Sequence, residues 1–216
     1  MEMNMKKKKK KITSYQLCLA AMAAGLNVAG GQLALMLRLP VYLDSIGTIF
    51  TGAFLGPWFG MVPSLLSGII MGVTTDIYSL YFAPVGMVTG FMAGVVWRKM
   101  SLEKGASFLK GRLWLLALAV AVPGTLVSSV ICAAVFGGIT SSGSAVLVQL
   151  LARTPLGMTA SIFVVQIVTD YLDRAVSMAA TAYMLKLLPF ALKEKWRGDW
   201  GHGSAEGTLQ QNYRKE

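Results

Sequence analysis

The sequence has 216 residues, of which 55% are hydrophobic and only 14% are charged. A soluble domain carries about 25% charged residues, so this composition excludes an ordinary water-soluble globule. The net charge is +10, but the basic residues flank apolar runs and no recognition motif accompanies them, which favours a membrane protein over a nucleic-acid-binding one.

Five apolar runs follow one another, at residues 15–37, 45–73, 81–97, 113–138 and 145–190. The first begins after the lysines of segment 6–11 and could be mistaken for a signal peptide ending near Ala21-Met22-Ala23. It continues to about Leu37, which predicts a first transmembrane helix instead. A spanning helix needs about 20 apolar residues, so the chain has room for about six spans.

The second run is too long for one ordinary span and contains Gly56-Pro57 in its middle. Gly-Pro is a strong signal for a break, so we predict two short helices at 45–56 and 58–74. The break also places the basic loop from Arg98 to Arg112 on the same side as the N-terminal lysines, as the positive-inside rule requires.

The last run is also divided. Its first piece, 145–152, is too short to span and is predicted to be interfacial or re-entrant. The final helix is expected from about Thr159 to Leu188. With both termini in the cytoplasm, the inner side then carries all of the 20 lysines and arginines except Arg38, Arg153 and Arg174.

The predicted fold is therefore an all-α membrane protein, a bundle of six transmembrane helices in the cell membrane. A cytoplasmic polybasic segment at 1–11 precedes the membrane domain at 12–190, and a flexible cytoplasmic tail at 191–216 follows it. Basic segments at the inner face also attract anionic membrane lipid.

Small residues recur at every fourth position in several predicted helices, which lets helix backbones approach closely in lipid. For the glycines Gly52, Gly56, Gly60, Gly86, Gly90 and Gly94 we expect packing within the bundle. The first helix has two such pairs, Ala20 with Ala24 and Ala21 with Gly25. Its stripe suits either internal packing or contact with a partner subunit.

Ionisable residues inside a membrane usually face a cavity or a partner. Gln166, Asp170, Asp173 and Arg174 share one face of the final helix, and Asp170 and Arg174 have the spacing of an i,i+4 ion pair. The group is either a structural ion pair or a polar site for a solute. Asn27 adds a buried polar group in the first helix.

The two outer loops combine acids with aromatic residues: Asp44 follows Tyr42 in the first, and Asp76 precedes Tyr78 and Tyr81 in the second. Rings that cover an organic solute and polar groups that orient it are typical of a ligand pocket. Anchoring at the membrane interface explains the same aromatic residues equally well.

Enzymatic activity is not expected. The only histidine is His202, in the predicted tail, so no Ser/His or Cys/His arrangement can form within the membrane. No residues have metal-ligand spacing and no phosphate-binding Gly-rich Lys motif is present. We therefore predict no catalytic residue, no metal and no cofactor, and any uphill transport would need another protein to hydrolyse ATP.

Over residues 12–190 the chain resembles the substrate-binding S components of energy-coupling-factor (ECF) transporters, a bacterial class of ABC importer. The resemblance rests on chain size, topology and local sequences in the expected order. These are Leu19-Ala20-Ala21-Met22-Ala23-Ala24-Gly25, Tyr42-Leu43-Asp44-Ser45-Ile46-Gly47-Thr48 with Gly52-Ala53-Phe54-Leu55-Gly56-Pro57-Trp58, Tyr81-Phe82-Ala83-Pro84-Val85-Gly86, and Asp173-Arg174-Ala175-Val176-Ser177 before Leu188-Pro189. Many relatives have Lys where Arg174 stands, which keeps the charge but not its geometry.

The resemblance implies capture of a vitamin, nucleoside or similar micronutrient from outside. It also implies docking on a coupling transmembrane subunit that two ATPase subunits drive. The docking face would include Ala20, Ala21, Ala24 and Gly25. The substrate site would draw on Asn27, Asp44, Asp76, Tyr78, Tyr81, Gln166, Asp170, Asp173 and Arg174. A membrane sensor or scaffold without transport, and a stand-alone carrier of small solutes, remain the alternatives.

Overall fold

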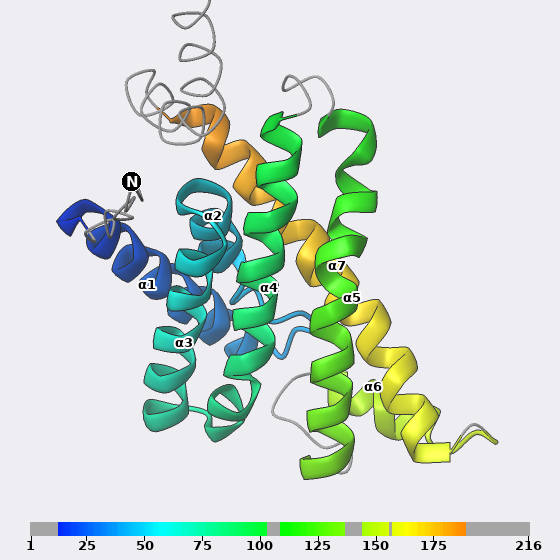
Figure 1. Ribbon diagram of the computed structural model, residues 1–216. Helices are drawn as coiled ribbons and strands as arrows, with labels where there is room; N and C mark the ends of the chain where they lie inside the picture. Colours follow the sequence, from blue (N-terminus) through cyan, green and yellow to red (C-terminus); the bar gives the residue numbers. More distant parts are fainter. Residues whose placement is uncertain (1–12, 103–108, 137–143, 156, 189–216) are drawn as a thin grey trace, which may run out of the picture.

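The computed structural model describes residues 13–102, 109–136, 144–155 and 157–188, and these residues form an all-α structure (Figure 1). The predicted segments 1–11 and 191–216 lie outside the described residues. The helices, in chain order, are α1 (Ser14–Met36), α2 (Ile46–Leu55), α3 (Pro57–Thr74), α4 (Ile77–Leu102), α5 (Leu109–Phe136), α6 (Ser144–Leu151) and α7 (Gly157–Leu187).

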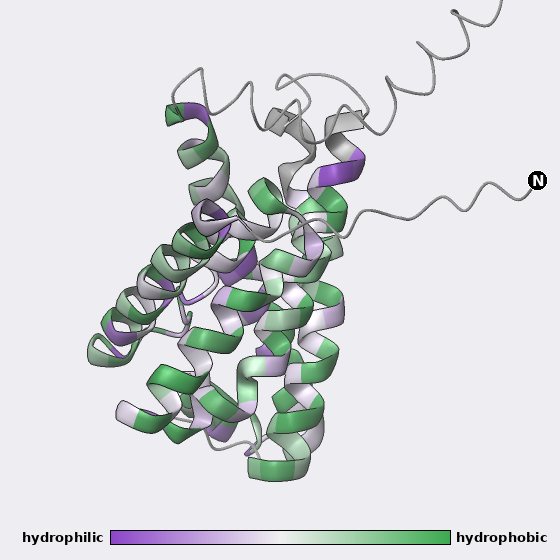
Figure 2. Ribbon diagram, turned by 60° about the vertical axis from the view of Figure 1, so that its left-hand side comes forward, coloured by the Kyte–Doolittle hydropathy of each residue, from purple (hydrophilic) through white to green (hydrophobic). Residues whose placement is uncertain are grey.

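Four of these helices, α1, α3, α4 and α5, are long and apolar enough to cross a membrane, which makes the chain a multi-pass transmembrane protein. Hydrophobic residues recur along all of these helices, and strongly hydrophilic residues are few (Figure 2). The other three helices fall outside this group. α6 has only 8 residues. α2 has only 10 residues, and α7, although it has 31 residues, carries Asp170, Asp173 and Arg174 near its middle.

The predicted break at Gly56-Pro57 is confirmed, because α2 ends at Leu55 and α3 begins at Pro57. Gly56 has a φ of 103°, a conformation that is accessible to glycine and strained for other residues. Pro57 then occupies the first position of α3, where its missing N–H costs no hydrogen bond. The pair reverses the chain direction, so that α2 and α3 form a helical hairpin.

The division of the last apolar run is also confirmed. The short helix α6 covers Ser144–Leu151, and the long helix α7 begins at Gly157, two residues before the predicted start. Gly157 has a φ of 73°, so the turn between the two helices also uses the backbone freedom of glycine. α6 packs on α7 through Val148, which joins Ile162 and Val165 in a small apolar cluster with Cys132 of α5.

Glycines allow α2, α3 and α4 to pack backbone against backbone. A Cβ atom on Gly60 would lie 2.7 Å from the Cα atom of Gly52 and 2.5 Å from the carbonyl oxygen of Gly90. A Cβ atom on Gly94 would lie 2.5 Å from the Pro57 nitrogen. The expected internal packing of these glycines is therefore confirmed, and α4 is held against the α2–α3 hairpin.

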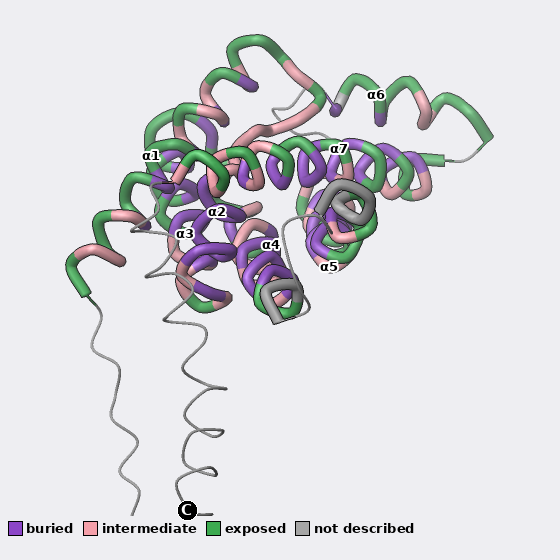
Figure 3. The backbone as a smooth tube through the Cα atoms, turned by 90° about the horizontal axis from the view of Figure 1, so that it is seen from above, coloured by how far each residue is buried: buried purple, intermediate pink, exposed green. Residues whose placement is uncertain are grey.

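A core on one side of this hairpin joins α2, α4, α5 and α7 through Ile49, Ala93, Val120 and Met178. The view along the bundle shows buried residues on the facing sides of these helices, with α1 and α6 at the edges (Figure 3). α7 runs obliquely across the bundle and contacts α2, α5 and α6. Its middle is therefore the place where polar residues from several elements can meet.

Gly60→Ala is expected to lower the free energy of unfolding by about 1–3 kcal/mol, because the new methyl group cannot avoid the backbones of α2 and α4. The matched control is Gly25→Ala, since a Cβ atom there meets nothing within 4 Å. The control should be neutral or stabilising by up to about 1 kcal/mol, from helix propensity alone. Thermal unfolding in mild detergent measures both. Equal effects of the two substitutions would contradict the packing described here.

Candidate functional site

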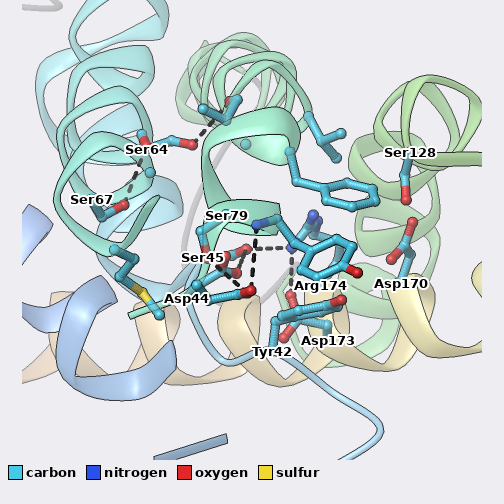
Figure 4. Close-up of a pocket in the computed structure, with 18 of the residues that line it drawn as sticks. Tyr42, Asp44, Ser45, Ser64, Ser67, Ser79, Ser128, Asp170, Asp173 and Arg174 are labelled. Carbon is cyan, nitrogen blue, oxygen red and sulfur yellow. Dashed lines mark hydrogen bonds and ion pairs between the residues drawn. The ribbon is translucent and has the colours of Figure 1, made fainter. Parts of the chain in front are cut away.

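A polar pocket lies where the segment between α1 and α2 (residues 37–45, here called loop one) meets the middle of α7 (Figure 4). α3, the first part of α4, the turn between these two helices and the middle of α5 complete its walls. Its volume is about 50 Å³ in this conformation. The polar and aromatic lining residues are Tyr42, Asp44, Ser45, Ser64, Ser67, Asp76, Tyr78, Ser79, Phe82, Ser128, Gln166, Asp170, Asp173 and Arg174.

The second half of loop one turns into the bundle, whereas Leu37, Arg38 and Pro40 in the first half are exposed. The backbone N–H of Leu43 donates a hydrogen bond to Oδ1 of Asp173 over 2.8 Å, and Leu43 has a φ of 53°. A positive φ is uncommon for leucine, so surrounding contacts must hold the loop in this shape. Gly30 permits the approach, because a Cβ atom there would lie 3.1 Å from the Leu43 carbonyl carbon.

Arg174 is the centre of a buried network. Its Nη1 donates to Oδ2 of Asp173 and to the hydroxyl of Ser45, and the Ser45 hydroxyl donates to Oδ1 of Asp44 over 3.1 Å. The i,i+4 spacing of Asp170 and Arg174 does not lead to a direct ion pair, since the ion-pair partner of Arg174 is its neighbour Asp173. Loop one takes part in this arrangement, because the same Nη1 atom of Arg174 donates to both Ser45 and Asp173.

Asp170 consequently has spare hydrogen-bonding capacity. Its side chain is 7% exposed, and its Oδ2 atom has no hydrogen-bond partner. The hydroxyls of Thr125 and Ser128 on α5 are placed to donate to the carboxyl group, and Figure 4 shows Ser128 facing it. A buried carboxyl oxygen without a partner costs free energy, and a bound ligand would recover it.

Asp76 and Tyr78 reach the pocket from the start of α4. Oδ1 of Asp76 accepts a hydrogen bond from the Tyr78 backbone N–H over 3.3 Å, and Oδ2 accepts one from the Ser79 hydroxyl over 3.3 Å. Asp76 thus caps the helix in the usual manner of an N-terminal aspartate. The ring of Tyr78 packs against Phe136 of α5, with 4.7 Å between ring centroids.

The pocket contains more carboxyl groups than cations. Asp44, Asp76, Asp170 and Asp173 face a single guanidinium, that of Arg174. Burial, and next the neighbouring Asp173 carboxylate, raise the pKa of the Asp44 carboxyl above its ordinary value.

Most of the predicted substrate residues come together here, namely Asp44, Asp76, Tyr78, Gln166, Asp170, Asp173 and Arg174. Two do not line the pocket. Asn27 of α1 is fully buried against the start of α2. Its Nδ2 donates to the Thr48 hydroxyl over 2.7 Å, and its Oδ1 accepts from the Gly47 N–H over 2.8 Å. Tyr81 is 49% exposed and packs its ring edge-on against Phe136.

Asn27 therefore has a structural role, and Asn27→Ala is expected to lower the free energy of unfolding by about 2–4 kcal/mol. The substitution leaves the Gly47 N–H without its acceptor and the Thr48 hydroxyl without its donor, each at a cost of about 1–3 kcal/mol. Thermal unfolding of the purified protein measures the loss. The ligand affinity of the folded fraction should not change. A large loss of affinity without a loss of thermal stability would show that Asn27 belongs to the substrate site.

The four predicted docking residues of α1 divide into two pairs. Ala20 and Ala24 are 1% and 2% exposed, because they lie on the side of α1 that packs against the rest of the bundle. Ala21 and Gly25 are exposed, on the opposite side of the helix. Within the described chain, only the second pair is accessible to another protein.

Several pocket residues were not predicted from the sequence. Ser64 and Ser67 of α3 and Ser128 of α5 are buried hydroxyls within apolar helices, and single serines are common in such helices for packing reasons. Their spacing gave one signal: Ser64 and Ser67, like Thr125 and Ser128, are three residues apart and share a helix face. Tyr42 and Ser45 lie in the predicted first outer loop, close to Asp44, but only Asp44 was assigned to the site.

Comparison with known proteins gave no match to a protein-family model, to a curated protein or to a solved structure. The site is therefore interpreted from its own geometry and chemistry.

Proposed function

We propose that the protein is the substrate-capture subunit of an ECF-type importer, which binds a small organic solute from outside and docks on an ATPase-driven coupling module. The observation that carries the proposal is the pocket itself. Loop one, the α3–α4 turn, α5 and α7 bury several ionisable side chains around one space, and Asp170 presents an unpartnered oxygen there. Such groups within a membrane domain are typical of substrate pathways and sites.

In this proposal α2 and α7 complete a six-span bundle with both termini in the cytoplasm. The end of α4, the start of α5 and the end of α7 lie together at the top of Figure 1, and basic residues flank all three. The α3–α4 turn, which supplies Asp76, lies at the opposite end. The positive-inside rule then assigns the pocket to the outer half of the membrane.

The exposed side of α1 supports the docking part of the proposal. Ala21 and Gly25 lie beside the apolar side chains of Leu17, Met22 and Leu26, which are 63%, 73% and 39% exposed. A small-residue stripe flanked by large apolar side chains allows a second helix to approach closely in lipid. α1 also lies at the edge of the bundle, where a partner can reach it (Figure 3).

The volume of the pocket adds a mechanical requirement. Sites for drug-sized ligands occupy about 300–1,000 Å³, far more than the 50 Å³ of this conformation. Capture of a whole vitamin or nucleoside therefore requires the pocket to open. Loop one is the element to move, since it contributes Tyr42, Asp44 and Ser45 to the pocket wall. Its movement would break the hydrogen bonds from Leu43 to Asp173 and from Arg174 to Ser45.

Reconstitution into proteoliposomes tests the proposal against its alternatives. An S component takes up solute only when the coupling subunit, both ATPase subunits and ATP are present. A stand-alone carrier produces flux without them, and a sensor or scaffold produces none in either condition. Uptake that does not depend on ATP would contradict the proposal. So would the absence of uptake when the complete module, ATP and a solute that the protein binds are all present.

A further inference from the structure

The partners of the pocket carboxyl groups indicate what kind of ligand the pocket selects. Asp173 uses both oxygens within the protein, one for the Leu43 N–H and one for Arg174. Asp76 uses both oxygens to cap α4. Asp44 accepts one hydrogen bond from the Ser45 hydroxyl, and Asp170 has an oxygen without a partner. Neither forms a direct ion pair with Arg174, whose close carboxylate partner is Asp173.

The second observation is the unpartnered oxygen of Asp170. The Asp170 side chain is more than nine-tenths buried, it lines the pocket, and its Oδ2 lacks a donor. The nearby Thr125 and Ser128 hydroxyls cannot neutralise a charge. A ligand that brings both a hydrogen-bond donor and a positive charge would satisfy this oxygen with a charge-assisted hydrogen bond.

Aromatic side chains form another part of the wall. Tyr42 comes from loop one, and Tyr78 and Phe82 come from α4; Figure 4 shows Tyr42 beside Asp173. Ring faces attract organic cations and cover their apolar parts. In the part of the chain that the structure describes, no three His, Cys, Asp or Glu residues are arranged to hold a metal ion. The combination favours an organic cation over an inorganic one.

We propose that the pocket selects a compact organic cation, an ammonium or amidinium group on a small ring, with Asp170 and Asp44 binding the charge and the rings of Tyr42, Tyr78 and Phe82 covering the apolar part. The inference rests on the proposed function and names its substrate class. The present volume of about 50 Å³ suits the charged head group, and loop one must move to admit the ring.

Three probes with one ring and different charges test the inference: benzylammonium, benzyl alcohol and benzoate. Each is added at millimolar concentration to the full-length protein in mild detergent at neutral pH, and the unfolding temperature is recorded. We expect benzylammonium to raise that temperature in a saturable manner, and the other two to have little effect. Asp170→Asn should abolish the shift. The control variant Asp199→Asn makes the same chemical change at a position beyond residue 188, outside the described residues, and should retain the shift.

Each other outcome overturns the inference in a distinct way. Stabilisation by benzyl alcohol or benzoate, removed by Asp170→Asn, would refute cation selectivity while leaving solute capture intact. Stabilisation by sodium chloride alone, with no further effect of benzylammonium, would identify an inorganic cation site. No shift with any probe would reject the named class, and capture would then be judged by ATP-dependent uptake. If Asp170→Asn does not fold, Asp44→Asn takes its place.

Discussion

Arg174→Met is expected to lower the free energy of unfolding by about 3–5 kcal/mol. Methionine fills a similar volume but cannot donate to Asp173 or to Ser45, the two groups that Arg174 bonds in the buried network. Removing one partner of a buried ion pair leaves the other charge uncompensated, which accounts for an effect of this size. Unfolding of the purified protein, followed by temperature or by denaturing detergent, measures the loss.

Two further variants identify the cause. Arg153→Met, at an exposed position in the turn after α6, should change stability by less than about 0.5 kcal/mol. Combining Arg174→Met with Asp173→Asn should recover part of the loss, because the uncompensated carboxylate is removed as well. If Arg174→Met and Arg153→Met are equally mild, the network does not hold loop one against α7.

Gly25→Trp is expected to reduce ATP-dependent uptake by about tenfold or more, while ligand binding to the isolated protein stays unchanged. Gly25 lies on the exposed side of α1, and a Cβ atom there meets nothing within 4 Å, so the new side chain leaves the helix into open space. A large ring on a small-residue stripe prevents a second helix from approaching. Uptake and ligand binding are measured on the same preparation.

Val130→Trp is the matched control, because Val130 is 59% exposed and belongs to α5, on the other side of the bundle from α1 (Figure 3). It should leave uptake near the level of the unmodified protein. Loss of uptake in both variants would indicate a general effect of bulky residues in the membrane. Normal uptake with Gly25→Trp would exclude this side of α1 as the docking surface.

Much of the helical framework could be predicted because local chemistry determines it. Gly56-Pro57 divides the second apolar run through backbone constraints that act whatever the rest of the fold does. The common face of Gln166, Asp170, Asp173 and Arg174 follows from helical periodicity, and all four side chains are buried in the pocket. Both features depend on residues close together in the sequence.

The errors arose where distant segments meet. Spacing along α7 is compatible with an Asp170–Arg174 pair, but Arg174 instead bonds Asp173 and Ser45, which is 129 positions away. Asn27 was assigned to the substrate site because buried polar groups in membranes are often functional. Its amide instead forms hydrogen bonds with Gly47 and Thr48 at the start of α2. The inward fold of loop one depends on Asp173 and Gly30, and no local pattern in the loop reveals it.

Native mass spectrometry of the protein purified in mild detergent tests solute capture most directly. The account predicts a small organic molecule bound in a one-to-one ratio. It also predicts that the molecule is lost from Asp170→Ala and retained by Gln149→Ala, a substitution at an exposed position of α6. Protein that is folded but carries no ligand, after growth in both rich and defined media, would contradict capture and favour a sensor or scaffold.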